Sequence, residues 1–326
     1  MTERRAFSGS IETPILVKNR PTGYRVVLSF KPIKITVLDV VIVLAIATVG
    51  GYTAYRLNTN IHYHWRWDIM FQYLFHKNPD TGRWTPNLLM QGFFTTLRLS
   101  VWAMLLATII GAVVGFFRVS PSRFKRMTGR TFVELIRNTP PLVLIFIFYY
   151  FIGDQIMPLL GLDHMTHRAS PATQHILSSL LAPPRFLTAF VSATITLAVV
   201  EAAYIAEIVR AGIQSVEKGQ IEASYALGLS WRQQMQFIVL PQAVQTVLPA
   251  LAGQFISTIK DSAIVSVISI PELCFQGMEL VSATYLTFEC WITIAGLYLI
   301  LTLSLSIVVE RIEIMMKKKS SHIGRM

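Results

Sequence analysis

Charged side chains are scarce in this sequence of 326 residues. Asp, Glu, Lys and Arg make up 14% of the chain, and hydrophobic residues make up 53%. A soluble globular domain carries about 25% charged residues. The deficit excludes an ordinary soluble enzyme, and the high hydrophobic content excludes a disordered chain. The composition indicates a protein that is dissolved in lipid.

Cysteine and the common catalytic motifs are also scarce. The chain has two cysteines, Cys274 and Cys290, which are too few for a disulfide framework or a zinc cluster. We place both near the outer face, flanking one short loop, where inert apolar cysteines are the default and a disulfide is the alternative. The sequence has no G-x-x-x-x-G-K-[ST], G-x-S-x-G or H-E-x-x-H motif. The chain therefore cannot hydrolyse ATP through a P-loop, and we expect neither a catalytic residue nor a cofactor of its own.

Long apolar segments are what the sequence does contain. A helix needs about 20 apolar residues to cross the hydrocarbon core. We predict an all-α membrane protein with six spanning helices at Ile35–Tyr55, Phe93–Phe117, Pro141–Leu160, Phe186–Val209, Gln242–Ile270 and Phe288–Glu310. The third is the weakest, because Gly153, Asp154 and Pro158 interrupt its end. The fifth contains Pro249, so we expect it to kink or to begin before the membrane.

The basic residues give the orientation. With six spans and an inner N-terminus, 21 of the 29 Lys and Arg residues fall on the inner side and five on the outer side. Basic residues concentrate in cytoplasmic loops, so both termini are predicted to be cytoplasmic. We assign 1–34 to a retained cytoplasmic tail, 35–57 to the first spanning helix, 58–87 to an outer loop and 313–326 to a basic tail. The net charge of +11 is thus an orientation signal and not a nucleic-acid patch.

An aromatic-rich outer loop carries two histidines. His62 and His64 are two residues apart, a spacing that can chelate a metal on a strand, but no third ligand accompanies them. Trp65, Trp67 and Trp84 lie in the same loop, and tryptophan favours the membrane interface. We expect interfacial packing here and no metal site.

The most informative stretch lies between the fourth and fifth spans, on the inner side. Gly228 allows a sharp turn between two short helices, since glycine tolerates a positive φ. Ser230 can cap the second helix, which starts at Trp231. A helix–turn–helix at the inner membrane surface predicts a docking surface for a soluble partner.

The residues of this stretch resemble a known motif. Glu222-Ala223-Ser224, three residues, Gly228, nine residues, Ile238, one residue and Leu240-Pro241 is similar to the EAA loop of ABC-importer permeases, with Ser224 in place of alanine. In that family the loop, here about 211–241, forms the coupling helix that docks on the ATP-binding subunit. The resemblance implies that Glu222, Ala223, Gly228, Ile238, Leu240 and Pro241 couple this chain to an ATPase.

Further segments resemble the polar amino acid permeases of histidine and glutamine type. They are Gly92–Leu97, Phe132–Leu142, Ala203–Ile213, Lys218–Gln220 and Lys260–Ser262, and the resemblance covers about 88–312. It implies an ABC type-1 importer transmembrane domain in a bacterial inner membrane. It also implies the partners: two ATP-binding cassette subunits, which bind ATP and Mg, an identical or homologous second permease, and a periplasmic substrate-binding protein.

Ionisable groups inside a span are costly and often mark a transport pathway. Glu201 is predicted just past the midplane of the fourth span, where it contacts substrate, forms a structural pair with Arg98 or Lys260, or lines a water-exposed cavity. Lys260 and Asp261 are adjacent, and we favour pairing between helices or subunits over a role in the substrate pathway. An ion-coupled secondary transporter that uses these groups is the alternative function, although we find no inverted repeat.

Three short spacings have structural interpretations. Glu207 and Arg210 lie three apart on one helix face and are expected to pair with each other or with a neighbouring subunit. Glu134 and Arg137 are also three apart and are read as structural, and Pro140-Pro141, which follow them, are expected to set the entry angle of the third span. Gly111 and Gly115 form G-x-x-x-G, which permits close helix packing.

Overall fold

The computed structural model describes residues 37–60, 63–79, 82–161 and 170–323 and divides the chain into two units. The first unit, Met1–His64, contributes one described helix, α1 (Val37–Asn60). This helix lies where the first span is predicted, and its apolar part is Val37–Thr53. The predicted cytoplasmic tail and His62 lie outside the described residues.

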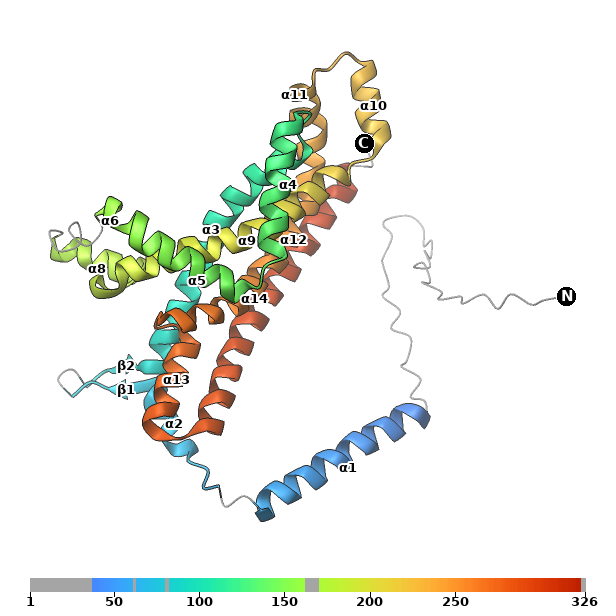
Figure 1. Ribbon diagram of the computed structural model, residues 1–326. Coiled ribbons are helices and arrows are strands. Elements are labelled where there is room, and N and C mark those ends of the chain that lie inside the picture. Colours follow the sequence, from blue (N-terminus) through green and yellow to red (C-terminus); the bar gives the residue numbers. More distant parts are fainter. Residues whose placement is uncertain (1–36, 61–62, 80–81, 162–169, 324–326) are drawn as a thin grey trace. The chain divides into compact units, whose positions relative to one another are not determined.

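The second unit, Trp65–Met326, is built almost entirely of helices (Figure 1). Its first part holds α2 (Trp67–Leu74), β1 (Phe75–Lys77), β2 (Trp84–Pro86), α3 (Leu88–Val119), α4 (Arg123–Arg137), α5 (Pro141–Phe151), a π-helical turn (Ile152–Ile156), α6 (Met157–Leu160) and α8 (Pro171–Leu180). Its second part holds a 3-10 turn (Pro184–Phe186), α9 (Leu187–Gln214), α10 (Lys218–Ala226), α11 (Trp231–Gln234), a π-helical turn (Met235–Val239), α12 (Leu240–Asp261), a 3-10 helix (Ser262–Ile268), α13 (Leu273–Thr284) and α14 (Thr287–Ile323).

Four helical segments of the described chain are long and apolar enough to cross a membrane. They are Leu88–Val119, Pro184–Gln214, Trp231–Ile268 and Thr287–Arg311. The pair α4 and α5 makes a fifth if it is taken as one span, because the two helices pass the same test only together, and it bends by 111° between Arg137 and Pro141. Pro140 and Pro141 stand at the bend, where they remove amide donors. Helical structure then continues from Pro141 to Leu160 with a π-helical turn at Ile152–Ile156, which covers the predicted third span.

The second, fourth and sixth spans are confirmed to within a few residues at their apolar ends. The fifth begins at Trp231, well before the predicted Gln242, and Pro249 lies inside α12. The expectation that it starts before the apolar segment is therefore confirmed. The count of six spans stays a prediction.

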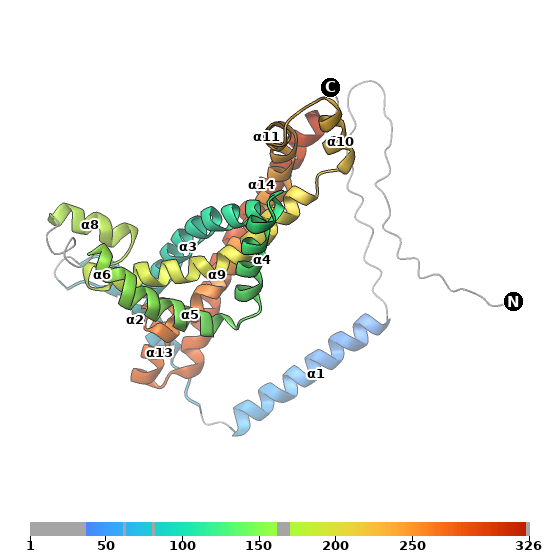
Figure 2. The same cartoon turned by 45° about the horizontal axis from the view of Figure 1, so that its top comes forward.

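The core lies between α3 and α9, which run side by side in both views (Figures 1 and 2). Their close approach depends on glycine. A Cβ at Gly111 would lie 2.7 Å from Ile205, and one at Gly115 would lie 2.8 Å from Val209. The G-x-x-x-G motif therefore serves helix packing, as predicted.

The end of the molecule opposite α10 and α11 is held by a buried polar network. Glu272, which is fully buried, caps α13 by accepting a hydrogen bond from the Phe275 amide at 2.7 Å. The same carboxylate accepts from the Thr96 hydroxyl on α3 at 3.3 Å and from the Tyr298 hydroxyl on α14 at 3.0 Å. Burial raises the pKa of Glu272, and these hydrogen bonds oppose that rise. One carboxylate thus joins three helices.

Helix α13 corrects one prediction. The segment between the fifth and sixth spans is not a short loop, because it contains the twelve residues of α13. Cys274 and Cys290 are free. The Cys274 thiol lies 3.7 Å from the Tyr298 hydroxyl, and the Cys290 thiol lies 3.4 Å from the Gly277 carbonyl. The disulfide alternative is therefore wrong for this structure.

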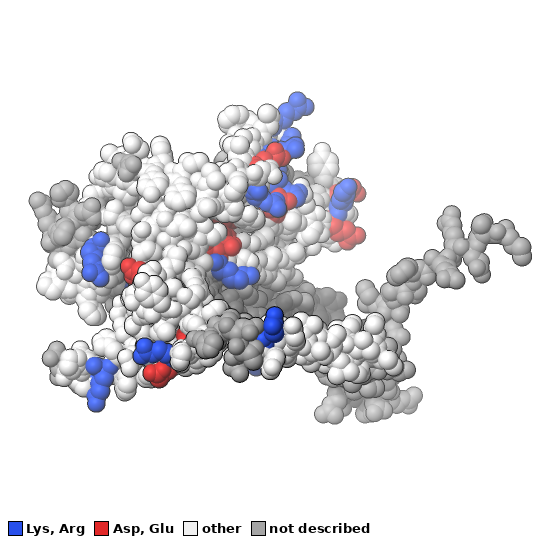
Figure 3. Space-filling model, turned by 60° about the horizontal axis from the view of Figure 1, so that its bottom comes forward, with Lys and Arg blue, Asp and Glu red and all other residues white. Residues whose placement is uncertain are grey.

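Charged side chains are sparse on the face shown in Figure 3, most of which is white, and several of them gather at its upper right. Among the described residues no group of three or more His, Cys, Asp or Glu could hold a metal ion. His64 is exposed, and Trp65 next to it stacks on Trp67 with ring centroids 5.8 Å apart. The aromatic packing predicted for this region is present.

Candidate coupling loop and translocation groups

The loop between α9 and α12 contains the two short helices predicted from the sequence, α10 and α11, at one end of the molecule (Figure 2). Gly228 has φ +77° and ends α10. Its amide donates to the Tyr225 carbonyl at 2.9 Å, and the Leu229 amide donates to the Ser224 carbonyl at 3.2 Å. This pair of hydrogen bonds is a Schellman motif, which needs a left-handed residue at the glycine position.

The start of α11 is fixed by a capping box. Both the amide and the hydroxyl of Ser230 donate to the Gln233 side-chain oxygen, at 2.9 and 2.8 Å. Ser230 is thus the N-cap of a helix that begins at Trp231, as predicted. The turn and its cap together set the angle between α10 and α11.

The motif residues lie mostly on the outside of this loop. Glu222, Ala223, Gly228 and Pro241 are exposed, whereas Ile238 and Leu240 are half-buried. Ser224, the one departure from the motif, is buried and donates to the Ile221 carbonyl at 2.7 Å. A small side chain suits this position because it is buried, and the serine hydroxyl is tolerated because it makes a hydrogen bond within its own helix.

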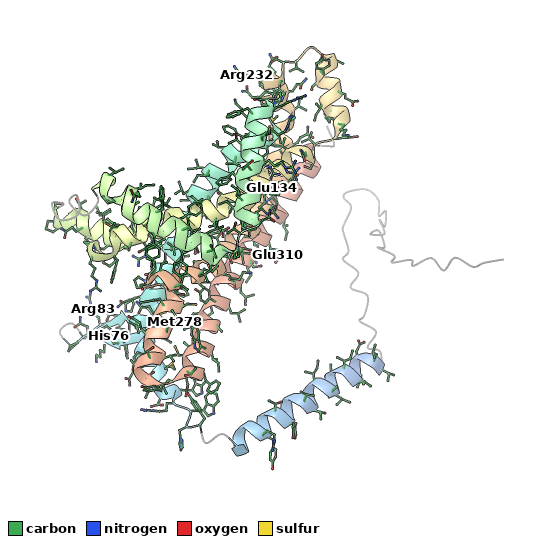
Figure 4. All side chains as sticks on the ribbon, in the orientation of Figure 1. His76, Arg83, Glu134, Arg232, Met278 and Glu310 are labelled. Atoms are coloured by element: carbon green, nitrogen blue, oxygen red, sulfur yellow. The ribbon has the colours of Figure 1, made fainter. Side chains whose placement is uncertain are left out.

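Sequence reasoning missed an apolar surface around the motif. Tyr225 is 78% exposed and Leu227 is 81% exposed, and Trp231 and Phe237 are exposed as well. Exposed apolar side chains on a short helical loop are typical of a protein–protein contact. We call the exposed apolar residues of this loop, Tyr225, Leu227, Trp231 and Phe237, the knob surface. The adjacent Arg232 is labelled in Figure 4.

An ion-pair network lies between this loop and the core. Glu207 pairs with Arg210 on α9, as predicted, and the Arg210 Nε donates to Glu207 Oε1 at 3.1 Å. Glu207 also pairs with Arg118 at the end of α3. Arg118 was not predicted, because it is distant in sequence. Glu134 pairs with Arg130 on α4, one turn away, and the Arg137 guanidinium lies 5.6 Å from the Tyr204 ring centroid.

The predicted translocation groups lie where α9 and α12 pack together. Glu201 is 1% exposed and accepts a hydrogen bond from the Gln254 side chain at 2.7 Å. The Asp261 carboxyl and the Thr258 hydroxyl also lie within interaction range of Glu201. Lys260 is exposed, on a different side of α12 from Asp261. The structure therefore brings Glu201 and Asp261 together and leaves Lys260 apart.

The predicted pairing of Glu201 with Arg98 or Lys260 is wrong. Arg98 instead donates to the Ser178 carbonyl at the end of α8, at 2.6 Å. The partner of Glu201 is Gln254, an uncharged residue that charge-pair reasoning does not consider.

The sequence from residue 103 to 317 matches the family model described as binding-protein-dependent transport system inner membrane component. This match covers more than half of the chain. The chain belongs to this family. It is an inner-membrane permease component, in agreement with its apolar helices.

The sequence is also similar to permeases of known transport systems. The chain is 34% identical over 232 residues to the probable glutamine ABC transporter permease protein GlnM of Bacillus subtilis, covering 71% of this chain and 94% of that protein. It is 33% identical over 230 residues to the glutamine transport system permease protein GlnP of Escherichia coli K12, covering 71% and 93%.

Solved structures share the fold. One is described as a crystal structure of an amino acid ABC transporter with histidines, with a TM-score of 0.55, 31% identity and coverage of 69% of this chain and 92% of that chain. An inward-facing form of the MetNI methionine ABC transporter has a TM-score of 0.53 at 21% identity, covering 70% and 96%, and shows the fold alone. The family membership disfavours the ion-coupled secondary transporter.

Proposed function

We propose that this protein is the permease subunit of an ATP-driven importer for a polar amino acid. The observation that carries the proposal is the exposed glycine turn between α10 and α11, set in the knob surface. Relatives named for glutamine transport, at 33–34% identity, support the substrate class. The chain itself catalyses no reaction in this proposal, and a partner supplies ATP hydrolysis.

The knob surface docks on that partner. An ATP-binding cassette subunit would cover Tyr225 and Leu227, whose exposure is otherwise costly in water. The exposed Glu222 and Ala223 lie on the same helix, and Ile238, Leu240 and Pro241 fix the start of α12. The assembly would contain two such ATPase subunits with their ATP and Mg, a second permease and a periplasmic substrate-binding protein.

Two glycines of this loop provide a matched test of docking. A Cβ at Gly228 or at Gly219 meets no atom within 4 Å, but only Gly228 has a positive φ. Gly228→Val should therefore strain the backbone by about 1–2 kcal/mol and distort the turn. Gly219→Val should leave the turn unchanged. In reconstituted transporter we expect Gly228→Val to hydrolyse ATP without importing substrate.

Gly219→Val should import substrate at close to the normal rate for each ATP hydrolysed. Normal coupled uptake by an inserted Gly228→Val transporter would overturn the docking assignment.

The polar group around Glu201 is our candidate for a substrate contact within the membrane. Glu201, Asp261 and Gln254 give one place on α9 and α12 with several acceptors, and such groups in a span usually face a pathway. We keep Lys260 as a candidate for the pathway at the exposed side of α12. The amino group of a substrate would bind the acceptors as substrate passes.

Glu201→Gln tests this role, because it keeps the shape and the hydrogen-bonding capacity while removing the charge. We expect the maximal uptake rate to fall by about tenfold or more, from loss of a charge-assisted hydrogen bond. ATP hydrolysis in the absence of substrate should stay unchanged. An unchanged uptake rate would assign Glu201 to structure alone.

A further inference from the structure

A large cavity opens at the end of the molecule opposite the knob surface. Its volume is about 890 Å³, within the range of small-molecule sites. The first turns of α3, the end of α8, the residues just before α9 and the segment Ser269–Glu279 form its walls. We call this cavity the outer vestibule. Neither Glu201 nor Asp261 lines it, so it is separate from the translocation groups described above.

One wall of the outer vestibule carries an incompletely used guanidinium group. Arg98 is half-buried and donates to the Phe94 carbonyl at 3.2 Å, the Ser178 carbonyl at 2.6 Å and the Thr95 hydroxyl at 3.4 Å. An arginine has five N–H donors in a fixed fork. These contacts use one hydrogen on each nitrogen and hold the group in place, so the two remaining N–H donors can bind a carboxylate.

The opposite polarity comes from α13. Gln276 lines the vestibule and is 7% exposed, and its buried side-chain oxygen has no hydrogen-bond partner in the described part of the chain. A buried acceptor without a partner is costly, by about 1–3 kcal/mol. Gln276 packs closely on Gly92 of α3, where a Cβ would lie 2.9 Å from the Gln276 Cγ. A ligand with an N–H donor would satisfy this oxygen.

The charges around the vestibule select the ligand further. Arg98 and Arg185 line it together with one acid, Glu279, so its lining is net positive. Thr95, Ser178 and Ser179 add polar groups to the lining, beside apolar side chains such as Phe94, Phe186 and Phe275. The combination favours a small molecule that has a carboxylate and an N–H donor and carries no net positive charge.

We propose that the outer vestibule is a binding site for a neutral or acidic amino acid, whose carboxylate binds Arg98 and whose N–H group binds the Gln276 oxygen. The site receives the amino acid before it moves between the helices. This inference rests on the proposed function, because it assigns one more site to the same substrate.

The test uses the full transporter in detergent, without the substrate-binding protein, and radiolabelled L-glutamine, L-glutamate and L-arginine as probes. Loss of a charge-assisted hydrogen bond predicts that Arg98→Gln weakens equilibrium binding of glutamine and glutamate by about tenfold or more. Binding of L-glutamine methyl ester, which lacks the free carboxylate, should change by less than about twofold. L-Arginine should bind more weakly than glutamine to the unsubstituted transporter.

Gln276→Leu separates binding from structure. It removes the unpartnered oxygen, so the thermal stability of the transporter should stay the same or rise while glutamine binding weakens by about tenfold. A purely structural glutamine would not move these two properties in opposite directions. Gln72→Leu and Arg83→Gln are matched controls, because both residues are absent from the vestibule lining and Gln72 is exposed. Arg83 is labelled in Figure 4.

Different results would refute the vestibule site and the proposed import of amino acids. Folded Arg98→Gln and Gln276→Leu transporters whose glutamine and glutamate binding stays within about twofold of normal would refute the vestibule site, while amino acid uptake would still support the proposed function. An unsubstituted transporter that imports none of the three amino acids would refute the substrate class and the vestibule site together.

Discussion

Helices α9 and α14 are both long and apolar, yet they occupy different environments. Within the most apolar part of each, 67% of the residues of the fourth span are buried inside the molecule, against 11% in the sixth. The buried side chains of α9 are largely small, among them Ala193, Ala198, Ala202, Ala203 and Ala206. The exposed side chains of α14 are large and branched, namely Leu299, Ile300, Leu303, Ile307 and Val308.

The two helices are also held by different forces. Small residues let α9 lie against α3 along its length, where packing and not the hydrophobic effect drives association in lipid. Near its start α14 packs on α13 through apolar side chains such as Cys290 and Ile294, and polar contacts add to this packing. Tyr298 donates to Glu272 at 3.0 Å, and Glu289 accepts from the Arg66 amide at 2.8 Å. Beyond them α14 leaves a broad apolar face of exposed leucine, isoleucine and valine side chains.

The largest effect should come from removing the anchor of α14. Glu272→Ala deletes a buried acceptor that serves Thr96, Phe275 and Tyr298. We expect the free energy of unfolding to fall by about 3 kcal/mol, because hydrogen bonds to a charged group are lost and their donors stay buried without partners. Thermal unfolding of the detergent-solubilised protein measures this change.

Two variants show whether the network or the mere presence of an acid matters. Glu272→Gln keeps an acceptor and should lose less stability than Glu272→Ala. Glu310→Ala removes an exposed acid from α14, labelled in Figure 4, and should have an effect within about 0.5 kcal/mol. Equal destabilisation by Glu272→Ala and Glu310→Ala would contradict the proposed anchor.

Hydropathy, spacing and turn chemistry predict much of this molecule. The apolar segments place the helices, and Gly228 and Ser230 correctly predict the turn and the cap of the loop. These features are local, so a few neighbouring residues determine them. The bend between α4 and α5 was likewise signalled by Pro140 and Pro141.

Other features depend on residues that are distant in sequence. From the sequence, helix α13 is interpreted as a loop because its twelve residues are too few to cross a membrane. The helix is stabilised by the hydrogen bond between Glu272 and Thr96 on α3. Arg118 joins Glu207, and Gln254 replaces a charged partner for Glu201. Only the packing of α3, α9, α12 and α13 brings these groups together, and neither spacing nor charge in the sequence signals it.

A smaller effect should separate the packing of α9 from that of α14, using two glycines. A Cβ at Gly111 on α3 would lie 2.7 Å from Ile205 and 2.8 Å from the Ala202 carbonyl of α9, whereas a Cβ at Gly296 on α14 meets no atom within 4 Å. Gly111→Ala should lower the free energy of unfolding by about 2 kcal/mol, because the backbones of α3 and α9 must move apart. Gly296→Ala should leave it unchanged or raise it by up to about 1 kcal/mol, since alanine favours helix. Unfolding of the detergent-solubilised monomer measures both.

The assembled transporter gives a second comparison. If Gly296→Ala is harmless in the monomer but destabilises the assembled transporter, another subunit packs on α14 at that glycine. Equal losses in the monomer would show that α14 is packed as closely as α9 and would refute the contrast drawn between them.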